Sequence, residues 1–187
     1  MAQDDPILIK AIQEIWIDPP SELPHNFSDP LATSHGLWDE DLVVDGLLNH
    51  REDGFFIEAG AVDGEAASNS FFFEVKRKWR GLLVEPDPTA YTMLKSKHRH
   101  AYSINSCLSD HASTVTIGQK TVDYFSLDVE GSEPAVLRSI PFDKVDIKLL
   151  TIQWIHCGKK VIRDILEPAG YHLAKEIEAD VIYVKNS

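Results

Sequence analysis

Strand-like and helix-like segments alternate along the chain from Gly54 onward, and this alternation constrains the fold more than any other feature. The strand-like runs are GFFIEAG, GLLVEP, AYSINSCL, VDYFSLDV and IKLLTIQWI. Helix-like segments (SNSFFFEVKRKW, TAYTMLKSKH, EPAVLRSI and KKVIRDILEPAG) follow the first, second, fourth and fifth of these runs. Short apolar strands that alternate with helices are typical of parallel βαβ units, so we predict an α/β fold.

The chain closes with two β-rich runs, YHLAKEIE and DVIYVKN. So few residues separate them that they must pair as an antiparallel hairpin. The prediction is therefore a seven-stranded sheet that is parallel except for this C-terminal antiparallel hairpin. Doubly wound domains that bind nicotinamide cofactors usually lack such a hairpin, whereas the fold of S-adenosylmethionine-dependent methyltransferases has it.

Residues 1–53 have a different character. They contain an amphipathic segment, ILIKAIQEIW, then a proline-rich stretch, IDPPSELPHNFSDP, and then LWDEDLVVDGLL with apolar residues at helical spacing. This pattern predicts an N-terminal helical arm or lid with an irregular middle, ahead of an α/β domain at residues 54–187. We expect the two parts to form one structural unit.

Charge and composition exclude some classes of protein. The formal net charge of −12 argues against a general affinity for nucleic acid or anionic membranes. No segment approaches the roughly 20 apolar residues of a membrane span, and the start MAQDDPILIK lacks the basic flank of a secretory signal, so we expect a cytoplasmic protein. The one basic run, KSKHRH at residues 95–100, is interpreted as a solvated helix end, with a basic contact patch as the alternative.

The first strand-like run ends in an acid and two glycines, in the order Glu58-x-Gly60-x-x-x-Gly64. Open α/β sheets bind ligands at this position, the carboxyl end of the strand. The register differs from the G-x-G-x-x-G that presents a helix N-terminus to a pyrophosphate. The glycines let the backbone approach a ligand, and the acid suits the ammonium and sulfonium of S-adenosylmethionine. A tight turn without a ligand is the alternative, because glycine is the default residue where φ is positive.

Polar residues also end the next two strands. Glu85 ends GLLVEP about 20 residues after the glycine turn, where ribose-binding acids occur in nucleotide-binding βαβ units. A carboxylate there can accept hydrogen bonds from both ribose hydroxyls. Ser109 or Asp110, at the end of the third strand, would lie beside an adenine and could bind its exocyclic amine.

Three acids crowd the end of the fourth strand in DYFSLDVEGSE. Asp128 is the best candidate to face the methionine end of the cofactor or the acceptor. Glu130 and Glu133 either join it or cap the helix that follows. Such crowding is costly unless the acids are solvated or have cationic partners.

These blocks resemble the FkbM-type methyltransferases, and more closely their animal, Star-like branch. GFFIEAGAVDGEAASNS, GLLVEPDP, INSCLSD, TVDYFSLDVEGSEPAVL and KLLTIQ match the successive blocks of that family in order, after the lead-in SHGLWDEDLVVDGLL. The resemblance implies a class I methyltransferase Rossmann-like sheet, S-adenosyl-L-methionine as cofactor, and O-methylation of a hydroxyl on a small molecule or sugar. It assigns cofactor-site roles to Glu58, Gly60, Asp63, Gly64, Glu85 and Asp128.

The chain departs from this family in two places. Only HASTVTIGQKT connects the third and fourth strands, which leaves too little chain for a covering helix. We therefore expect a bare sheet face that is solvated, covered by the arm, or used in self-association. Gln153 stands where the family commonly has an acid, which removes a charge near the acceptor. His156, just past the same strand, is a candidate general base for a hydroxyl, with a packed or surface histidine as the alternative.

Two classes of function remain after these observations. The leading hypothesis is an S-adenosylmethionine-dependent methyltransferase that acts on a small-molecule or glycan hydroxyl, with Asp128 and His156 as the candidate catalytic residues. The alternative is a catalytically inactive methyltransferase-like module that acts in protein interaction or trafficking, which the short connection and Gln153 favour. A third possibility is a shortened enzyme that is stable only as an oligomer.

Overall fold

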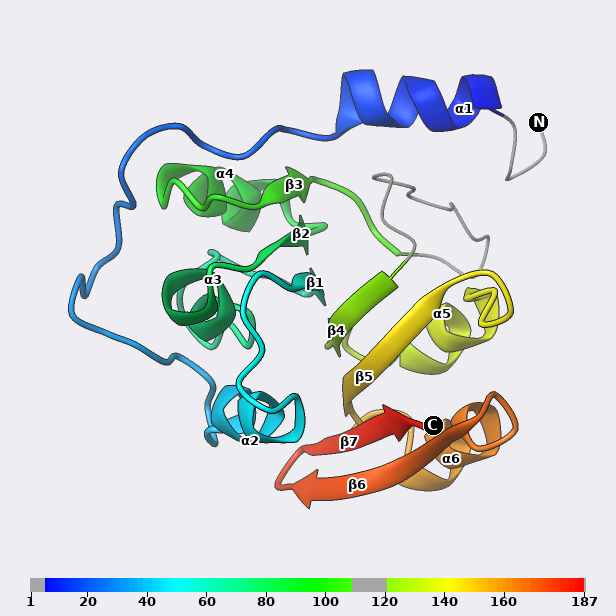
Figure 1. Cartoon of the computed structure of the whole chain (residues 1–187). Helices are drawn as coiled ribbons and strands as arrows, with labels where there is room; N and C mark the ends of the chain where they lie inside the picture. Colours follow the sequence, from blue (N-terminus) through cyan, green and yellow to red (C-terminus); the bar gives the residue numbers. More distant parts are fainter. Residues whose placement is uncertain (1–5, 109–120, 187) are drawn as a thin grey trace.

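The structure is a computed structural model that describes residues 6–108 and 121–186, and its centre is one seven-stranded mixed sheet (Figure 1). The strands are β1 Phe55–Ala59, β2 Arg80–Val84, β3 Tyr102–Ile104, β4 Thr121–Leu127, β5 Asp146–Gln153, β6 Tyr171–Ile177 and β7 Asp180–Lys185. The helices are α1 Pro6–Ala11 with a π-helical continuation Ile12–Trp16, α2 Glu40–Leu47, α3 Phe71–Arg77, α4 Pro88–Ser96, α5 Glu133–Ser139 and α6 Lys159–Leu166. The predicted adenine contacts Ser109 and Asp110 lie outside the described residues.

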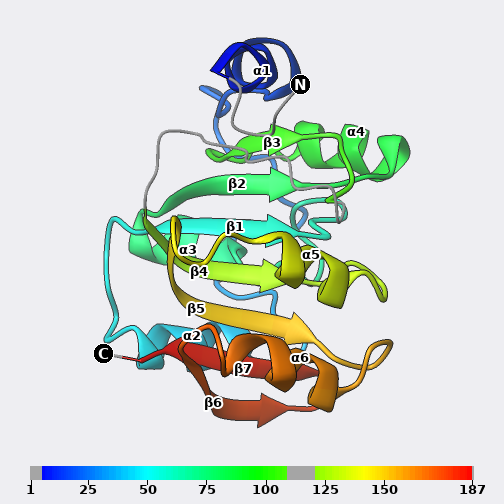
Figure 2. The ribbon, with the colours of Figure 1, turned by 90° about the vertical axis from the view of Figure 1, so that its right-hand side faces the viewer.

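The strand order is β3-β2-β1-β4-β5-β7-β6. Strands β3, β2, β1, β4 and β5 run parallel, and β7 is antiparallel to both β5 and β6, so the predicted C-terminal hairpin is confirmed. The arrowheads of β2, β1, β4 and β5 point to one edge of the sheet (Figure 2). The third strand is shorter than the run AYSINSCL predicted, because only three of its residues pair with β2.

Helices cover the sheet from both sides. Helices α2, α3 and α4 lie on one face and α5 and α6 on the other (Figure 1). The first layer buries Phe56, Phe73 and Tyr124, and the second buries Phe125 and Leu137. Central parallel strands are buried on both faces, which is why runs such as FFIEA and RGLLV are apolar almost throughout.

The start of α4 shows how local sequence sets an element boundary. The Asp87 carboxylate accepts hydrogen bonds from the backbone N–H groups of Thr89 and Ala90, at 2.7 and 2.8 Å. Pro88 follows as the first helical residue, where its missing N–H costs nothing. The cap therefore fixes the point at which the chain leaves the β2 end and turns back across the sheet.

The face that carries α5 and α6 has no helix over β1, β2 and β3 in the described part of the chain (Figure 1). The apolar side chains there are nevertheless buried, with Phe55 6%, Leu82 2% and Val84 2% exposed. Ile17 from the arm packs against the same cluster. A solvated face is therefore wrong for these three side chains, and the contact of Ile17 agrees with the alternative that the arm covers part of this face. Self-association through this face stays a prediction.

The arm between Ile17 and Asp39 contains no regular helix or strand, as its prolines predicted. It is nevertheless fixed to the sheet, because Asp18 forms an antiparallel bridge to Ser103 of β3. The Tyr91 hydroxyl on α4 also donates to the Asp18 carboxylate at 2.6 Å. These contacts make the arm part of the folded structure at the β3 edge.

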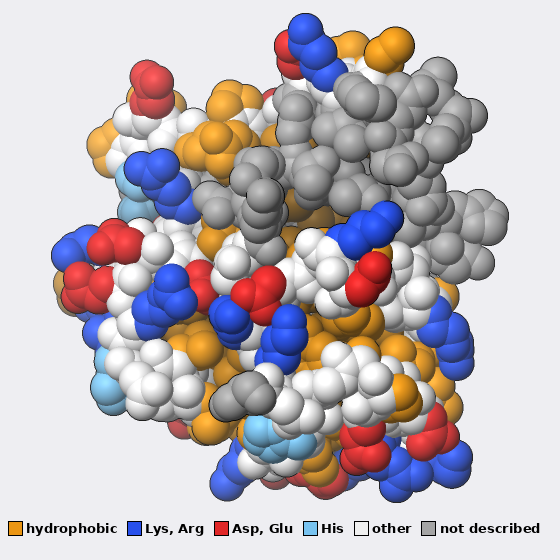
Figure 3. Space-filling view, turned by 45° about the vertical axis from the view of Figure 1, so that its right-hand side comes forward, with side chains coloured by type: hydrophobic (Ala, Val, Ile, Leu, Met, Phe, Trp, Pro, Cys, Tyr) orange, Lys and Arg blue, Asp and Glu red, His pale blue; other side chains and the backbone are white. Residues whose placement is uncertain are grey.

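Charges of both signs are mixed on the face of the molecule shown in Figure 3. Within the described residues, no helix is long and apolar enough to cross a membrane. On the visible, described part of the face in Figure 3, basic and acidic side chains alternate with apolar ones and do not gather into one basic region.

Candidate functional site

The carboxyl ends of β1, β2 and β4 bring most of the predicted site residues together. In the register, Glu58 is opposite Ser126 of β4 and Leu83 of β2. Past the strand ends, the N–H of Gly60 donates to Val84 O at 3.0 Å, and the N–H of Asp128 donates to Ala59 O at 3.0 Å. The glycine turn therefore lies between the ends of β2 and β4.

Gly60 is the residue at which this close approach is most severe. Its φ is +86°, and a Cβ built on it would lie 1.9 Å from the backbone oxygen of Asp128. Because no side chain fits at that distance, only glycine allows the turn to pass over the end of β4. The turn is thus a cradle made of backbone atoms.

Asp63 and Gly64 shape the rest of the turn. One Asp63 carboxylate oxygen accepts from the N–H groups of Glu65 and Ala66, at 2.9 and 2.8 Å. Gly64 has a φ of +77°. In this structure both residues hold the turn in shape, and any contact of theirs with a cofactor stays a prediction.

Glu58 is fully engaged inside the protein. Its two carboxylate oxygens accept hydrogen bonds from the hydroxyls of Ser68 and Ser70 and from the N–H of Asn69, at 2.5 to 2.8 Å. Burial raises the pKa of Glu58, and the charge of Arg99 and these hydrogen bonds oppose that rise. The carboxylate therefore holds the segment between the glycine turn and α3.

Arg99 lies at the centre of this polar cluster, and sequence reasoning missed it. The guanidinium is 1% exposed and donates to Glu74, to the backbone oxygen of Gly64, and to the hydroxyls of Ser68 and Ser70. We call Arg99, Glu58, Glu74, Ser68 and Ser70 the Arg99 cluster. Burial alone would raise the pKa of Glu74, but Arg99, His25 and the N–H of His100 lower it to about 2.

The interpretation of KSKHRH as a solvated helix end is therefore wrong for two of its members. Besides Arg99, Lys97 is only 13% exposed and donates to Glu65 at 2.6 Å and to Ser28 of the arm at 2.8 Å. The signal that could have found them is the pair of acids in the apolar segments FFIEA and FFFEV, Glu58 and Glu74. A buried carboxylate needs a cation or several donors, so these two acids indicate a buried cation. Lys76 and Arg77 are nearer along the chain, so the sequence alone does not select Arg99.

Glu85 stands at the end of β2, as predicted, and is 6% exposed. One carboxylate oxygen accepts from the N–H of Val62 in the glycine turn, and the other from the N–H of Asp87, both at 2.8 Å. Each carboxylate oxygen can accept a second hydrogen bond, so capacity for a diol remains.

Asp128 ends β4 and carries a strongly shifted pKa. Burial is the largest cause, the charges of Glu130 and Glu133 add to it, and together they raise the pKa of Asp128 to about 6. Gln153 of β5 donates its side-chain amide N–H to one Asp128 oxygen at 2.9 Å. The other Asp128 oxygen and the Gln153 side-chain oxygen are buried without a hydrogen-bond partner among the described residues. The Gln153 amide therefore gives Asp128 a hydrogen-bond donor and adds no negative charge beside it.

Glu133 and His156, on either side of Asp128, have different environments. One oxygen of Glu133 accepts from the N–H groups of Val129 and Gly131, at 3.0 and 3.1 Å, so Glu133 caps the turn before α5. The His156 side chain is 48% exposed, with Nε2 2.9 Å from a carboxylate oxygen of Glu130. His156 therefore lies at the surface of the site.

Two buried acids on the α2 side of Asp128 were not found from the sequence. Glu40 begins α2 and is 1% exposed, and Asp180 begins β7 opposite Gln153 and is 8% exposed. The Asp180 carboxyl shares a hydrogen bond with that of Glu40. Burial, then the charges of Glu40 and Asp128, raise the pKa of Asp180 to about 7. The sequence predicts only a helix at WDED and a strand start at Asp180. No local pattern indicates that Glu40 and Asp180 lie close together.

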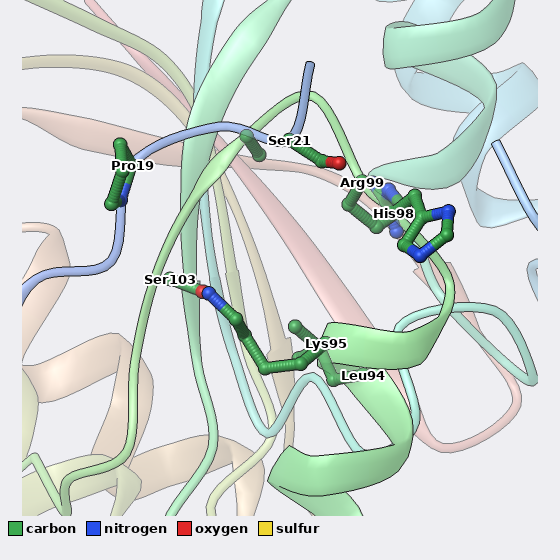
Figure 4. Close-up of a pocket in the computed structure, with 8 residues that line it drawn as sticks. Pro19, Ser21, Leu94, Lys95, His98, Arg99 and Ser103 are labelled. Atoms are coloured by element: carbon green, nitrogen blue, oxygen red, sulfur yellow. The ribbon is translucent and has the colours of Figure 1, made fainter. Parts of the chain in front are cut away.

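A separate cavity of about 120 Å³ lies between the arm and the α4–β3 connection (Figure 4). Pro19 and Ser21 line it from the arm, and Lys95 and His98 line it from the end of α4 and the turn that follows. Arg99 also borders it, but none of the residues predicted for the cofactor site does. We therefore place the candidate site at the strand ends and not at this cavity.

No protein-family model and no curated protein sequence matches the chain. Solved structures do match. The precorrin-6y C5,15-methyltransferase of Geobacter metallireducens aligns with a TM-score of 0.55 and 14% identity, over 91% of this chain and 100% of that one. A TehB-like S-adenosylmethionine-dependent methyltransferase of Corynebacterium glutamicum aligns with a TM-score of 0.55 and 14% identity, over 80% and 89% of the two chains.

A third match was solved with a product of the cofactor. The 1,6-didemethyltoxoflavin-N1-methyltransferase of Burkholderia thailandensis, with bound 1,6-didemethyltoxoflavin and S-adenosylhomocysteine, aligns with a TM-score of 0.52 and 10% identity. The alignment covers 79% of this chain and 76% of that one. At such identities the likeness shows the fold alone.

Proposed function

We propose that this chain, which has the class I S-adenosylmethionine-dependent methyltransferase fold, binds S-adenosyl-L-methionine and methylates a hydroxyl of a small molecule or sugar. The observation that carries the proposal is the backbone cradle at Gly60, which closes against the end of β4 and next to two buried acceptor atoms that have no donor among the described residues. The FkbM-type resemblance of the sequence supports the same activity.

The residues fit the cofactor in charge and in hydrogen-bonding capacity. Asp128 and Gln153 each keep a buried oxygen that needs a donor, and an ammonium has three donors and no acceptor. The carboxylate of Glu85 retains acceptor capacity for two ribose hydroxyls. Because Glu58 is engaged in the Arg99 cluster, we assign it to holding the segment after the glycine turn and not to direct contact.

When bound, S-adenosylmethionine would supply a methyl group from its sulfonium sulfur, which becomes a neutral thioether as the new C–O bond forms. The chain must then hold the acceptor oxygen in line and take its proton. Asp128, whose pKa is raised to about 6, is the group at the end of β4 that we assign to take this proton, and His156, past the end of β5, is the alternative. Rate enhancement would come mainly from positioning.

Calorimetry with S-adenosylmethionine and S-adenosylhomocysteine tests the proposal. We expect both to bind the wild-type protein, and Asp128→Asn and Glu85→Gln each to weaken binding by about tenfold, roughly the effect of one charge-assisted hydrogen bond. The matched control is Asp146→Asn, since Asp146 lies at the opposite end of β5 and pairs with Lys148 and Lys185. Folded protein that takes up neither ligand at millimolar concentration would refute the proposal.

The second candidate function, a catalytically inactive module for protein interaction or trafficking, is favoured by one observation. Gln153 supplies a neutral donor to Asp128 where the family commonly has an acid. In that case the cofactor binds, but no acceptor is methylated. Turnover of any hydroxyl acceptor with labelled S-adenosylmethionine would exclude this candidate, and binding without turnover would support it.

A further inference from the structure

Each residue of the basic run KSKHRH contacts the arm. We call this run, residues 95–100, the docking strip. Its contacts with the arm measure 2.9 to 3.1 Å between polar atoms: Lys95 Nζ pairs with Asp18, Ser96 O accepts from the Asn26 side-chain amide, Lys97 O accepts from Asn26 N, His98 Nδ1 donates to Pro24 O, Arg99 O accepts from Ser21 N, and His100 Nε2 donates to Leu23 O. The arm thus lies along the whole strip, which runs from the end of α4 toward β3 (Figure 1).

Hydrogen bonds at the surface hold most of this part of the arm. No residue from Asp18 to Asp39 is buried, and Leu23 and Leu31 are 56% and 88% exposed. The cavity of about 120 Å³ in Figure 4 lies between the arm and the docking strip. Segments with few buried apolar contacts open at a lower free-energy cost than the core of a protein. The arm should therefore leave the docking strip without unfolding of the sheet.

Glu65 connects the docked arm to the glycine turn. It directly follows Gly64 and is 3% exposed. Its carboxylate accepts hydrogen bonds from the backbone N–H of Ser28 at 2.7 and 2.9 Å and from that of Asp29 at 3.2 Å, and Lys97 of the docking strip donates to it at 2.6 Å. Burial alone would raise the pKa of Glu65, but Lys97 and the two N–H groups lower it to about 2. The groups that stabilise its charge therefore lie in the arm and the docking strip.

The arm makes a second contact at Phe71, the first residue of α3. The rings of Phe27 and His35 pack edge-on against the Phe71 ring, with centroids 4.6 and 4.4 Å away, and Phe71 is completely buried. The arm thus contacts both ends of the segment between Gly64 and Phe71. The Arg99 cluster holds the same segment from the inside. The shape of the segment after the glycine turn therefore depends on both supports.

We propose that Glu65 is a positioning residue that couples docking of the arm to the shape of the glycine turn, so that the docked arm and S-adenosylmethionine favour each other's binding. This inference rests on the proposed function and specifies how its cofactor site is regulated. When the arm leaves the docking strip, Glu65 loses two N–H donors and the segment after Gly64 loses its outer support. Because coupling between two sites is reciprocal, the cofactor strengthens docking by the same factor as docking strengthens cofactor binding.

Hydrogen–deuterium exchange of the full chain, read by mass spectrometry, tests this reciprocity. The amides of residues 21–29 report on docking, since those of Ser21, Asn26 and Ser28 donate to the docking strip and to Glu65. We expect saturating S-adenosylhomocysteine to slow their exchange at least about fivefold, the lower end of typical coupling between two sites. Unchanged exchange of the arm in protein that binds the ligand would overturn the proposal.

Variants of the contact between Glu65 and Lys97 separate coupling from a structural role. Lys97→Met and Glu65→Gln should each weaken binding of S-adenosylhomocysteine at least about fivefold and abolish the ligand-dependent protection of the arm. Lys97→Arg, which keeps the charge, should stay close to the wild type. The matched control is Lys78→Met, because Lys78 is 70% exposed and pairs with Glu52. A purely structural Lys97 would lower the melting temperature and leave the protection in place, which would overturn the proposal.

The outcome for the arm is distinguishable from the outcome for the cofactor. If S-adenosylhomocysteine binds and Lys97→Met leaves its affinity unchanged, only the coupling fails. If the wild-type protein binds no S-adenosylhomocysteine, the proposed function fails, and exchange without ligand still tests the role of Glu65. In that case the amides from Gly64 to Ser70 should exchange faster in Lys97→Met and Glu65→Gln than in the wild type, and equal exchange would show that the arm does not hold the turn.

Discussion

The Arg99 cluster and a second group of acids, Glu40, Asp128 and Asp180, both bury carboxylates on the α2–α3 face of the sheet. We call the second group the acid cluster, and among the described residues only the Arg99 cluster contains a cation. In the Arg99 cluster, the guanidinium and several hydrogen bonds hold the pKa of Glu74 at about 2. In the acid cluster, Asp180 has its pKa raised to about 7, with burial and two further acids as the causes. A counter-charge keeps a buried carboxylate ionised, whereas burial among other acids favours its protonated form.

The largest expected effect comes from removing the cation of the Arg99 cluster. Arg99→Met leaves Glu58 and Glu74 buried without their counter-charge, so we expect the free energy of unfolding to fall by about 3 to 5 kcal/mol. Urea denaturation at pH 7 measures it. The control is Arg163→Met on the exposed face of α6, which should change stability by less than about 0.5 kcal/mol. A loss below about 1 kcal/mol for Arg99→Met would show that the Arg99 guanidinium is not what stabilises the buried acids of this cluster.

A smaller effect is expected at the cradle between the two regions. Gly60→Ala adds a Cβ 1.9 Å from a backbone oxygen, whereas Gly158→Ala has a similar φ of +84° but nothing within 4 Å. Both substitutions place a side chain at a residue with positive φ, so both should lower the free energy of unfolding through backbone strain. The loss should be about 2 kcal/mol larger for Gly60→Ala, because only its Cβ clashes with the backbone, as in an overpacked core. Gly60→Ala should also abolish binding of S-adenosylhomocysteine. Equal losses of stability in Gly60→Ala and Gly158→Ala would show that the backbone around residue 60 shifts and removes the clash.

Two groups of acids should respond to pH in opposite directions: Glu74 of the Arg99 cluster together with Glu65, and Asp128 together with Asp180. Glu58 of the Arg99 cluster has a raised pKa and belongs with the second group. Glu65 and Glu74 have pKa values lowered from 4.5 to about 2, so the stability they contribute is complete above pH ~5 and is lost as the pH falls toward 2. Asp128 and Asp180 have pKa values raised from 3.8 to about 6 and about 7, so stability falls as the pH rises from ~4 to ~7. We expect a maximum of the melting temperature between about pH 4 and 5.

The variant Asp180→Asn sharpens this test. It removes one titrating group from the acid cluster and none from the Arg99 cluster, so the decline in melting temperature between about pH 4 and 7 should become shallower while the acid limb is unchanged. An unchanged decline would mean that Asp180 is not a source of the effect.

The smallest effect on stability is expected at the exposed edge of the site. His156 and Glu130 form an ion pair whose side chains are 48% and 77% exposed, and such pairs contribute little. His156→Ala should therefore change the free energy of unfolding by less than about 0.5 kcal/mol. If His156 is the general base, turnover should still fall by about 100-fold. Full turnover in His156→Ala would leave Asp128 as the proton acceptor.

Much of the fold could be predicted because it depends on local patterns. The apolar runs, the helical spacings and the Asp87-Pro88 cap are each readable within a few residues, and each corresponds to an element of the structure. The glycine turn and Glu85 were likewise found because ligand sites lie at strand ends. The short connection predicted a sheet face without a covering helix but left open what covers it, and Ile17 of the arm packs there against the cluster of Leu82 and Val84.

The sequence by itself determined the α/β class, the closing hairpin and the position of the glycine turn, since periodicity and turn residues act over short distances. Only the tertiary structure decided the partners of the buried charges. Arg99 meets Glu58 and Glu74, and Glu40 meets Asp180, because the strand order brings distant segments to one edge of the sheet. The free energy of a buried charge depends on such neighbours in space, and no local pattern records them.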